Sequence, residues 1–418
     1  MNKDNKYGLF TTIALIIGIV IGSGIYFKSD DILMATNGNI HLGVILLSVC
    51  SIGMVSGGLT LAEYAKNGGG LIDYYEKYVN RKMAIAYGNF QFIILIPTLN
   101  IVVAWVASIY TFELFDLKVN NYTFVLAYIY IILLTLLNIY SKQMAGFLQN
   151  IATIIKIIPL VFVGIISLFI KNNTSIEEIS VIQQNHNWMS AILPIMFSYE
   201  GWIMATNIAK EVKNPKRNIK LALMISPIII VVLYIIYFVG LSTILTPSVI
   251  LEKQDAALST LFFNLFGKIG EKGILLVVLI SIIGVLNGLT LCGIRIVNVL
   301  YESKLIKIKA EVNEKYGISI KSAIIYFIIA TIWLIIHYIT CISNVIPGRD
   351  VSEISIIFNY IMYIPLYFSV KGKISSYIAI LFSIVIAIMS FLVSPIYIGM
   401  FFLISLITTI CSVYIIGN

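Results

Sequence analysis

Gly18, Gly22, Ser23 and Gly24 lie within seven residues of one another in an apolar stretch near the N-terminus. Glycines at this spacing can form a face on which membrane helices pack closely. A serine between two glycines can also unwind a helix and turn backbone amides and a hydroxyl toward a ligand. Amides at a helix start attract a carboxylate, and unwound carbonyls attract an ammonium. The stretch is therefore either a packing face or a site for a ligand with both groups, such as an amino acid.

A second apolar stretch reads FSYEGW over residues 197–202. Glu200 lies deep within it, where a carboxylate costs at least about 2.5 kcal/mol unless it is paired or hydrated. We therefore expect Glu200 at a cavity; the alternative is a helix end in contact with loop water. Trp202, one residue past Gly201, is either a gate beside that cavity or an aromatic side chain that faces lipid.

Lys156 lies thirteen residues after the start of its apolar stretch at residue 143. That is too deep for the ammonium to reach either membrane surface easily. The ammonium needs a carboxylate or carbonyls, and carbonyls are exposed only where helices are broken. The alternative is a lysine in a water-filled vestibule with no part in coupling.

No residue pattern in the sequence indicates that the protein performs chemistry on a substrate. The three histidines, His41, His186 and His337, are scattered and none has metal-ligand spacing to another. The sequence contains no Walker loop, no nucleophile elbow and no paired carboxylates typical of a hydrolase. We therefore expect no enzyme activity, no catalytic residue, no metal and no cofactor.

Composition shows which elements must position these residues. Of the 418 residues, 59% are hydrophobic and 11% are charged, against roughly 25% charged in soluble domains. Lipid must be the solvent for much of the chain. The formal net charge of +8 does not indicate nucleic acid as a partner, because the basic residues lie in short loops between apolar runs.

Apolar runs long enough to cross the hydrocarbon core, which takes about 20 residues per helix, occur twelve times. They lie near residues 8–35, 40–64, 83–110, 122–140, 143–170, 189–209, 217–243, 271–300, 321–342, 352–370, 374–394 and 396–416. If the N-terminus is cytoplasmic, 19 lysines and arginines fall on the inner side and 7 on the outer side. The positive-inside rule then predicts that both termini are cytoplasmic.

The two halves of the chain are alike. Residues 1–170 and 189–370 each hold five predicted spans, and an odd number means that the second set runs in the opposite sense. The first helix of each set is the one interrupted by glycine. Paired broken helices indicate an inverted-repeat transporter with a binding site near the membrane midplane. Residues 371–418 hold the eleventh and twelfth helices, outside the repeat.

Five motifs in the first 300 residues resemble the amino acid–polyamine–organocation superfamily, in particular its L-amino-acid-transporter-like branch. The motifs occur in family order. They are Gly22-Ser23-Gly24; Glu63-Tyr64 followed by Gly68-Gly69-Gly70 and Tyr74; Gln149-Asn150 through Lys156; residues 197–202 running into Glu211-Val212-Lys213-Asn214-Pro215; and Leu286-Asn287-Gly288 with Arg295.

The resemblance implies an all-α, twelve-helix LeuT-type fold with a 5+5 inverted repeat, broken helices 1 and 6, and alternating access. It also implies a set of substrate-binding residues. The substrate carboxylate would be held by amides of Ser23 and Gly24, with Gly22 beside them. The amino group would be held by carbonyls of Val20, Phe197 and Glu200. Ser198 lies in the second break, and Trp202 matches a family aromatic residue near the substrate. Lys156 would occupy the place where sodium-coupled relatives hold an ion, which disfavours sodium dependence.

These features predict a secondary active transporter of amino acids, a sodium-independent exchanger. Open alternatives are a proton-coupled uptake symporter, in which Glu200 or Lys156 titrates, and a basic amino acid or polyamine antiporter. A membrane nutrient sensor that binds without turnover is an alternative from another class. No filter-like motif or ring of pore-lining charge indicates a channel.

The predicted partners are an amino-acid substrate and membrane lipid. Eukaryotic members of the family attach a partner glycoprotein through a cysteine between helices 3 and 4. Residues 111–121 contain no cysteine, so we expect no disulfide-linked accessory subunit, and a monomer is among the options. Heavy use of isoleucine, lysine and asparagine favours a bacterial protein of the cytoplasmic membrane.

Overall fold

The computed structural model describes residues 6–65, 70–119, 121–140, 142–170, 187–313, 318–343, 351–393 and 395–415. Within these ranges the regular secondary structure is helical, with two isolated β-bridges and no strand. The first half contains α1 (Leu9–Val20), α2 (Ser23–Phe27), α3 (Ser29–Ala35), α4 (Ile40–Ala65), α5 (Leu71–Tyr78), α6 (Arg81–Phe90), η2 (Gln91–Leu95), α7 (Ile96–Leu114), α8 (Tyr122–Tyr140) and α9 (Lys142–Ile166). The second contains η4 (Trp188–Ala191), α10 (Ile192–Tyr199), η5 (Met204–Glu211), α11 (Pro215–Ile244), α12 (Pro247–Lys253), η6 (Gln254–Ala256), α13 (Ala257–Glu302), α14 (Ile320–Ser343), α15 (Val351–Ser369), α16 (Ile374–Val393) and α17 (Pro395–Ile415).

Among the described residues, 9 helical stretches are long and apolar enough to cross a membrane. Shorter apolar helices at Asn150–Ile166, Trp188–Tyr199 and Ile398–Cys411 overlap the other three predicted spans. The all-helical membrane fold is therefore confirmed, while the count of twelve spans stays a prediction.

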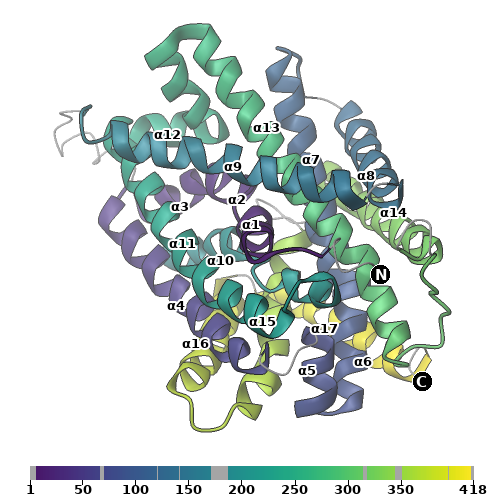
Figure 1. Cartoon of the computed structure of the whole chain (residues 1–418). Coiled ribbons are helices and arrows are strands. Elements are labelled where there is room, and N and C mark those ends of the chain that lie inside the picture. The colour runs from purple at the N-terminus through teal and green to yellow at the C-terminus, as the bar shows by residue number, and fades with distance from the viewer. Residues whose placement is uncertain are drawn as a thin grey trace.

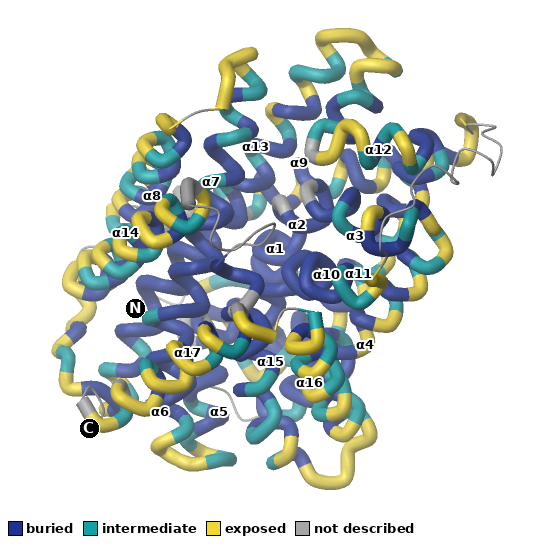
Figure 2. Tube along the Cα trace, turned by 180° about the vertical axis from the view of Figure 1, so that it is seen from behind, coloured by how far each residue is buried: buried dark blue, intermediate teal, exposed yellow. Residues whose placement is uncertain are grey.

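The broken helices lie at the centre of the molecule. Figure 1 shows α1 nearly end-on, with α9, α10, α11 and α13 around it. From behind, α1, α2 and α10 are buried, whereas α8, α14 and α16 turn exposed residues outward (Figure 2). Those outward residues are apolar: Leu133, Ile332 and Leu381 are 57%, 52% and 61% exposed. An apolar outer surface on a buried polar centre is the arrangement expected in lipid.

The first interruption has a local cause in the backbone. α1 ends at Val20 because Ile21 is extended, with φ −75° and ψ 99°, and Gly22 has φ −145° and ψ −138°. A Cβ atom on Gly22 would lie 2.4 Å from Cγ2 of Val285, so this glycine also lets α13 approach. The packing face and the unwound stretch, posed above as alternatives, are both present.

The second interruption follows α10. Glu200 is extended, with φ −72° and ψ 153°, and Gly201 has φ +103°, a conformation that a residue with a side chain rarely adopts. A Cβ on Gly201 would also lie 2.6 Å from Cγ2 of Ile19. The two breaks therefore lie against each other, with α1 packed beside the turn that follows α10.

Candidate functional site

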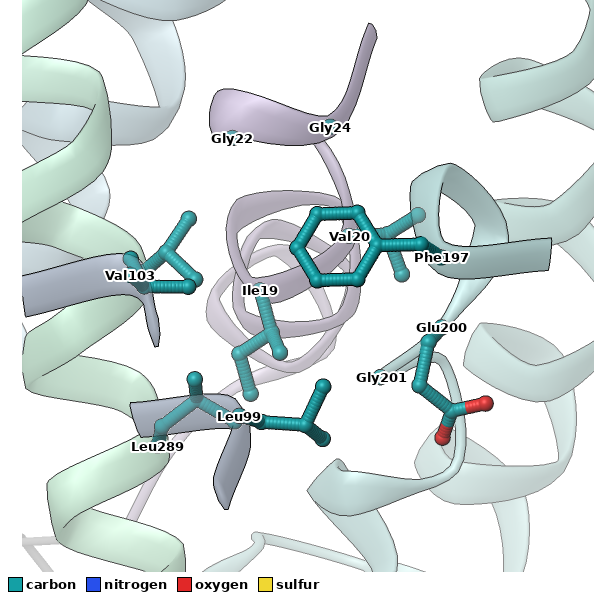
Figure 3. Close-up of a pocket in the computed structure, with 11 residues that line it drawn as sticks. Ile19, Val20, Gly22, Gly24, Leu99, Val103, Phe197, Glu200, Gly201 and Leu289 are labelled. Carbon is teal, nitrogen blue, oxygen red and sulfur yellow. The ribbon is translucent and has the colours of Figure 1, made fainter. Parts of the chain in front are cut away.

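A small cavity lies where the two breaks meet. Its lining residues come from the two breaks and from α7 and α13: Ile19, Val20, Gly22, Gly24, Leu99, Val103, Phe197, Glu200, Gly201, Val285 and Leu289 (Figure 3). Its volume is about 30 Å³, room for roughly one or two water molecules. An amino acid can enter only if the apolar side chains move apart.

The structure brings five of the predicted substrate residues to this cavity: Val20, Gly22, Gly24, Phe197 and Glu200. Three others are not among its lining residues. Ser198 is buried next to Phe197, and its hydroxyl donates to the Pro194 carbonyl at 2.9 Å. Trp202 is fully buried. Ser23 begins α2, but its side chain lies outside the described part of the structure, and so do the whole of Gly68 and Gly69.

Sequence reasoning missed the apolar wall. Leu99 and Val103 come from α7, and Val285 and Leu289 come from α13. Each pair is separated by four residues, so each lies on one face of its helix. Nothing distinguishes these aliphatic residues from their many neighbours in the sequence, and only the packing shows which ones face the cavity.

Glu200 is buried, but its carboxylate is turned away from the apolar side chains around Ile19 (Figure 3). Its Oε1 accepts a hydrogen bond from Nδ2 of Asn359 at 3.0 Å. Asn359 in turn accepts from the Tyr87 hydroxyl at 3.1 Å and lies 2.7 Å from the Tyr363 hydroxyl. The carboxylate thus belongs to a polar cluster between α6 and α15, and the alternative of a helix end in loop water does not hold.

Trp202 packs within the protein and does not face lipid. A Cβ on Gly57 of α4 would lie 3.1 Å from Cη2 of the indole, and the ring centre is 6.2 Å from that of Tyr363. The tryptophan therefore fills the space beside the Glu200 cluster, between α4 and α15.

Lys156 is fully buried, and its ammonium donates to the Gly18 carbonyl at 2.6 Å. Gly18 lies in the last turn of α1, where carbonyls lack a donor from their own helix. A Cβ on Gly284 of α13 would lie 3.6 Å from the same nitrogen, and the Tyr26 hydroxyl donates to the Lys156 carbonyl at 2.6 Å. Lys156 thus joins α9 to both halves of the first broken helix and lies against α13.

Residues 7–411 match a family model described as amino acid permease. The chain belongs to that family. It is an amino acid transporter and not an enzyme, as the sequence predicts, and the superfamily resemblance is confirmed.

Several curated transporters are similar to this permease. The serine/threonine exchanger SteT of Bacillus subtilis (strain 168) is 28% identical over 372 residues, which cover 87% of this chain and 82% of SteT. The b(0,+)-type amino acid transporter 1 of Mus musculus is 25% identical over 82% of this chain and 72% of its own. Among solved structures, MhsT in complex with L-phenylalanine matches with a TM-score of 0.62 and 13% identity, covering 96% of this chain and 98% of MhsT. That likeness confirms the LeuT-type fold.

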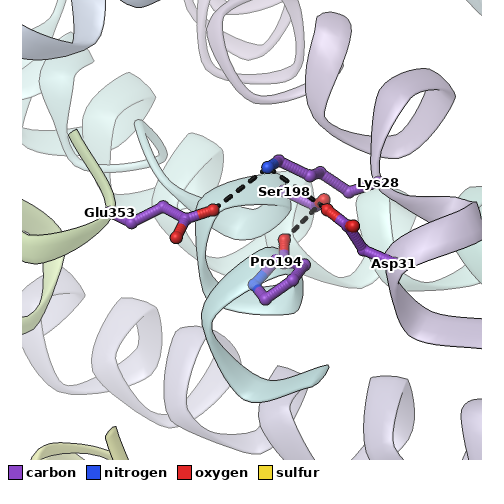
Figure 4. A network of polar contacts seen from close by, with 5 residues as sticks. All are labelled: Lys28, Asp31, Pro194, Ser198 and Glu353. Carbon is purple, nitrogen blue, oxygen red and sulfur yellow. Dashed lines mark hydrogen bonds and ion pairs between the residues drawn. The ribbon is translucent and has the colours of Figure 1, made fainter. Parts of the chain in front are cut away.

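A buried ion pair lies beside the cavity of the permease, on the side that the sequence predicts to be outer. Nζ of Lys28, the residue after α2, is 3.0 Å from Oε1 of Glu353 in α15 and 3.3 Å from Oδ2 of Asp31 (Figure 4). Lys28 and Glu353 are both buried, and the ammonium lies 5.7 Å from the ring centre of Phe197, which lines the cavity. The ion pair thus joins the second part of the broken helix to α15 directly over the cavity wall.

We expect Glu353→Gln to lower the free energy of unfolding of the permease by about 3 kcal/mol. Breaking a buried ion pair leaves an uncompensated charge, and the loss lies at the lower end of the usual range because Asp31 still faces Lys28. Equilibrium unfolding of purified protein in detergent measures the change. Glu252→Gln, which breaks the exposed pair with Lys253, is the control and should have no measurable effect. Equal effects of the two substitutions would contradict this account of Glu353.

Proposed function

We propose that this permease is a sodium-independent exchanger of neutral amino acids with small apolar side chains, working by alternating access. The cavity between the two helix breaks carries the proposal, because its side-chain lining is aliphatic or aromatic apart from Glu200, which is turned aside. Membership of the amino acid permease family and similarity to a serine/threonine exchanger support the exchange of small neutral amino acids, and the apolar preference rests on the cavity alone.

The two ends of a bound amino acid are assigned to backbone groups of the breaks. The amides of Ser23 and Gly24 would receive the carboxylate, and the carbonyls of Val20, Phe197 and Glu200 the ammonium. The Phe197 carbonyl already accepts from the Glu200 amide at 3.1 Å, but a carbonyl oxygen has a second lone pair for a ligand. Support for this assignment is that four of the five residues line one cavity.

The side chain of the substrate would lie between α7 and α13, against Leu99, Val103 and Leu289. A charged side chain there would lose its hydration without gaining a partner, which costs several kcal/mol. The carboxylate of Glu200 does not offset that cost, since it is held by Asn359 on the other side of the backbone turn. The cavity therefore favours neutral substrates over the basic amino acids or polyamines of the alternative antiporter.

We expect Glu200→Gln to leave the ratio of valine to arginine uptake unchanged within about twofold, even if both rates fall. The reason is that Glu200 lines the cavity while its carboxylate bonds to Asn359 and is turned away from the apolar side chains around Ile19. Competition by arginine against radiolabelled valine in proteoliposomes measures the ratio. A selective loss of arginine and lysine transport would contradict this orientation of Glu200. It would instead support recognition of cationic side chains by the Glu200 carboxylate.

The finer architecture belongs to the same proposal. Residues 1–170 would form the first five-helix repeat and residues 189–370 the inverted second one, with residues 371–418 supplying helices 11 and 12. Both termini would be cytoplasmic, in the cytoplasmic membrane of a bacterium. The excess of lysine and arginine on the predicted inner side supports this orientation.

The deciding experiment is reconstitution of the purified permease into proteoliposomes, with a panel of radiolabelled amino acids. Uptake of valine or alanine that requires internal unlabelled substrate, and is equal in sodium and choline buffers, is the expected result. Uptake driven by a proton gradient without internal substrate would replace exchange by symport. Binding without turnover under any gradient would indicate the sensor alternative and overturn the proposal.

A further inference from the structure

The side-chain carboxylate of Glu200 has no part in the substrate contacts proposed above. It is turned away from the apolar side chains around Ile19, and the residue is 5% exposed. Its Oε1 accepts the hydrogen bond from Asn359 at 3.0 Å, whereas Oε2 is buried without a hydrogen-bond partner in the described part of the chain. Buried polar atoms without a partner are rare in proteins. An ionised oxygen in that position would lose its hydration and gain nothing in return.

No positive charge offsets this carboxylate among the residues that the structure describes. The groups that donate to it are neutral amides, the side chain of Asn359 and the backbone of Gly201. The two buried lysines beside the breaks are engaged elsewhere, since Lys156 donates to a carbonyl of α1 and Lys28 belongs to the ion pair with α15. An isolated carboxylate in such surroundings takes up a proton more readily than it stays charged.

The helices that pack around the carboxylate present neutral side chains to it. The titratable or polar ones in the described structure are Tyr87 of α6, Trp202 of the break, Tyr360, Tyr363 and Tyr367 of α15, and Cys50 of α4, which lies beside Tyr360. α1, α7 and α13 contribute the apolar side chains of the cavity wall. Tyrosine and cysteine are ordinarily neutral at physiological pH. Glu200 is therefore the member of this cluster that can change its charge.

A proton suits this site better than a metal ion. A metal ion needs several oxygen ligands with free lone pairs. Asn359 instead points its N–H group at the carboxylate, and its oxygen already accepts from the Tyr87 hydroxyl. A proton needs one oxygen. Because Oε1 accepts from Asn359, Oε2 is the atom that would carry the hydrogen.

We propose that Glu200 is a proton-binding site, and that the two helix breaks come together only when this carboxyl group is protonated. The inference rests on the proposed function, because it takes this structure as a step of transport. The cavity of about 30 Å³ is too small for an amino acid, so the structure is a closed form.

The proton comes from water and returns to it. When the breaks separate, water reaches Glu200, the O–H bond at Oε2 breaks, and the proton leaves on a water molecule while the carboxylate keeps the electron pair. Closing reverses the step. An exchanger closes once in each direction for every pair of substrates that it moves, so the two protons cancel. Exchange therefore depends on pH but needs no proton gradient.

The first test is the pH profile of valine exchange in proteoliposomes, with the same pH on both sides, between about pH 6 and pH 8.5. The rate of the wild type should fall as the pH rises, approaching about tenfold per pH unit, because one proton is required. Glu200→Gln keeps the shape of the protonated acid and cannot ionise. Its rate, whatever its level, should stay constant within about twofold over the same range.

Glu113→Gln is the matched control for this profile. Glu113 is another partly buried glutamate, at the end of α7, and it is not among the residues that line the cavity. Its substitution should leave the pH dependence of the wild type intact. The same dependence in Glu200→Gln as in the wild type would overturn the inference, as would its loss in Glu113→Gln.

A second measurement does not require turnover. A folded form that holds a proton at Glu200 loses stability as the pH rises, because it binds more protons than the unfolded chain. The Tm of the purified wild type, relative to that of Glu200→Gln, should fall by roughly 3 °C over the same pH range. A constant difference in Tm would overturn the proton site. Absence of exchange at every pH would refute the proposed function, and the Tm would then still decide whether Glu200 holds a proton.

Discussion

Replacing Gly24 with valine is expected to lower the affinity of the permease for amino acids by at least about 100-fold. A Cβ atom on Gly24 would lie 2.8 Å from the Cα of Ser198 and 3.2 Å from its hydroxyl. The nearest of these atoms is backbone, so it cannot turn aside as a flexible side chain would. The two breaks must separate, which displaces the Ser198 carbonyl and the amides proposed for the substrate carboxylate. A loss of about 3 kcal/mol corresponds to the stated change in affinity.

Thermal stabilisation by saturating valine, measured on purified protein, tests this expectation without requiring turnover. Gly273→Val is the matched control, because a Cβ on Gly273 of α13 would have no neighbour within 4 Å. We expect the control to bind valine as the wild type does. A Gly24→Val protein that is folded and stabilised to the same extent would contradict the placement of the binding site at the helix 1 break.

The positions of the two breaks can be predicted from the sequence because their cause is local. Gly201 has a positive φ that other residues rarely adopt, and Gly22 is close enough to Val285 to exclude a Cβ atom. Glycines inside apolar stretches are visible without any tertiary information. The burial of Lys156 can be predicted in the same way, since a cation at mid-helix must find carbonyls or a carboxylate.

The cavity wall and the direction of Glu200 could not be predicted, because they depend on how whole helices rotate about their axes. α7 and α13 are apolar on nearly every side, so periodicity does not show that Leu99 and Leu289 face the substrate. The backbone of Glu200 is extended, and its carboxylate is held by a hydrogen bond from Asn359, which is 159 positions away in the chain. Tyr234 of α11, whose hydroxyl donates to the Val20 carbonyl at 3.0 Å, is one of 25 tyrosines and has no local signal at all.

The end of α1 shows how the fold satisfies a broken helix inside a membrane. Its last carbonyls have no water to accept from, and each unpaired one would cost several kcal/mol. In the last turn, Lys156 donates to Gly18 and Tyr234 donates to Val20. One turn earlier, inside the helix, the Thr153 hydroxyl donates to the Ala14 carbonyl at 2.9 Å. Two of these three donors come from α9. The position of the break is therefore coupled to α9, and under the proposed alternating access any movement of α1 would exchange these bonds for others.

Replacing Lys156 with methionine is expected to reduce amino-acid exchange by about 10- to 100-fold. Methionine keeps most of the volume of the lysine stem, so packing against Gly284 changes little. What is lost is a charge-assisted hydrogen bond to Gly18, worth roughly 1.5–3 kcal/mol, together with the positive charge proposed to replace an ion between α1 and α13. The initial rate of valine exchange in proteoliposomes of equal protein content measures the loss.

Lys253→Met removes a lysine that is exposed at the end of α12 and serves as the control. It should retain wild-type exchange, because its ammonium contacts only the neighbouring Glu252 among the ion pairs described. The wild type should transport equally in sodium and choline, since the ammonium already supplies a cation at the end of α1. Sodium stimulation of the wild type, or full activity of Lys156→Met, would contradict the proposal that the Lys156 ammonium replaces a coupling ion. Lys156 would then serve only in the packing of α9 against α1 and α13.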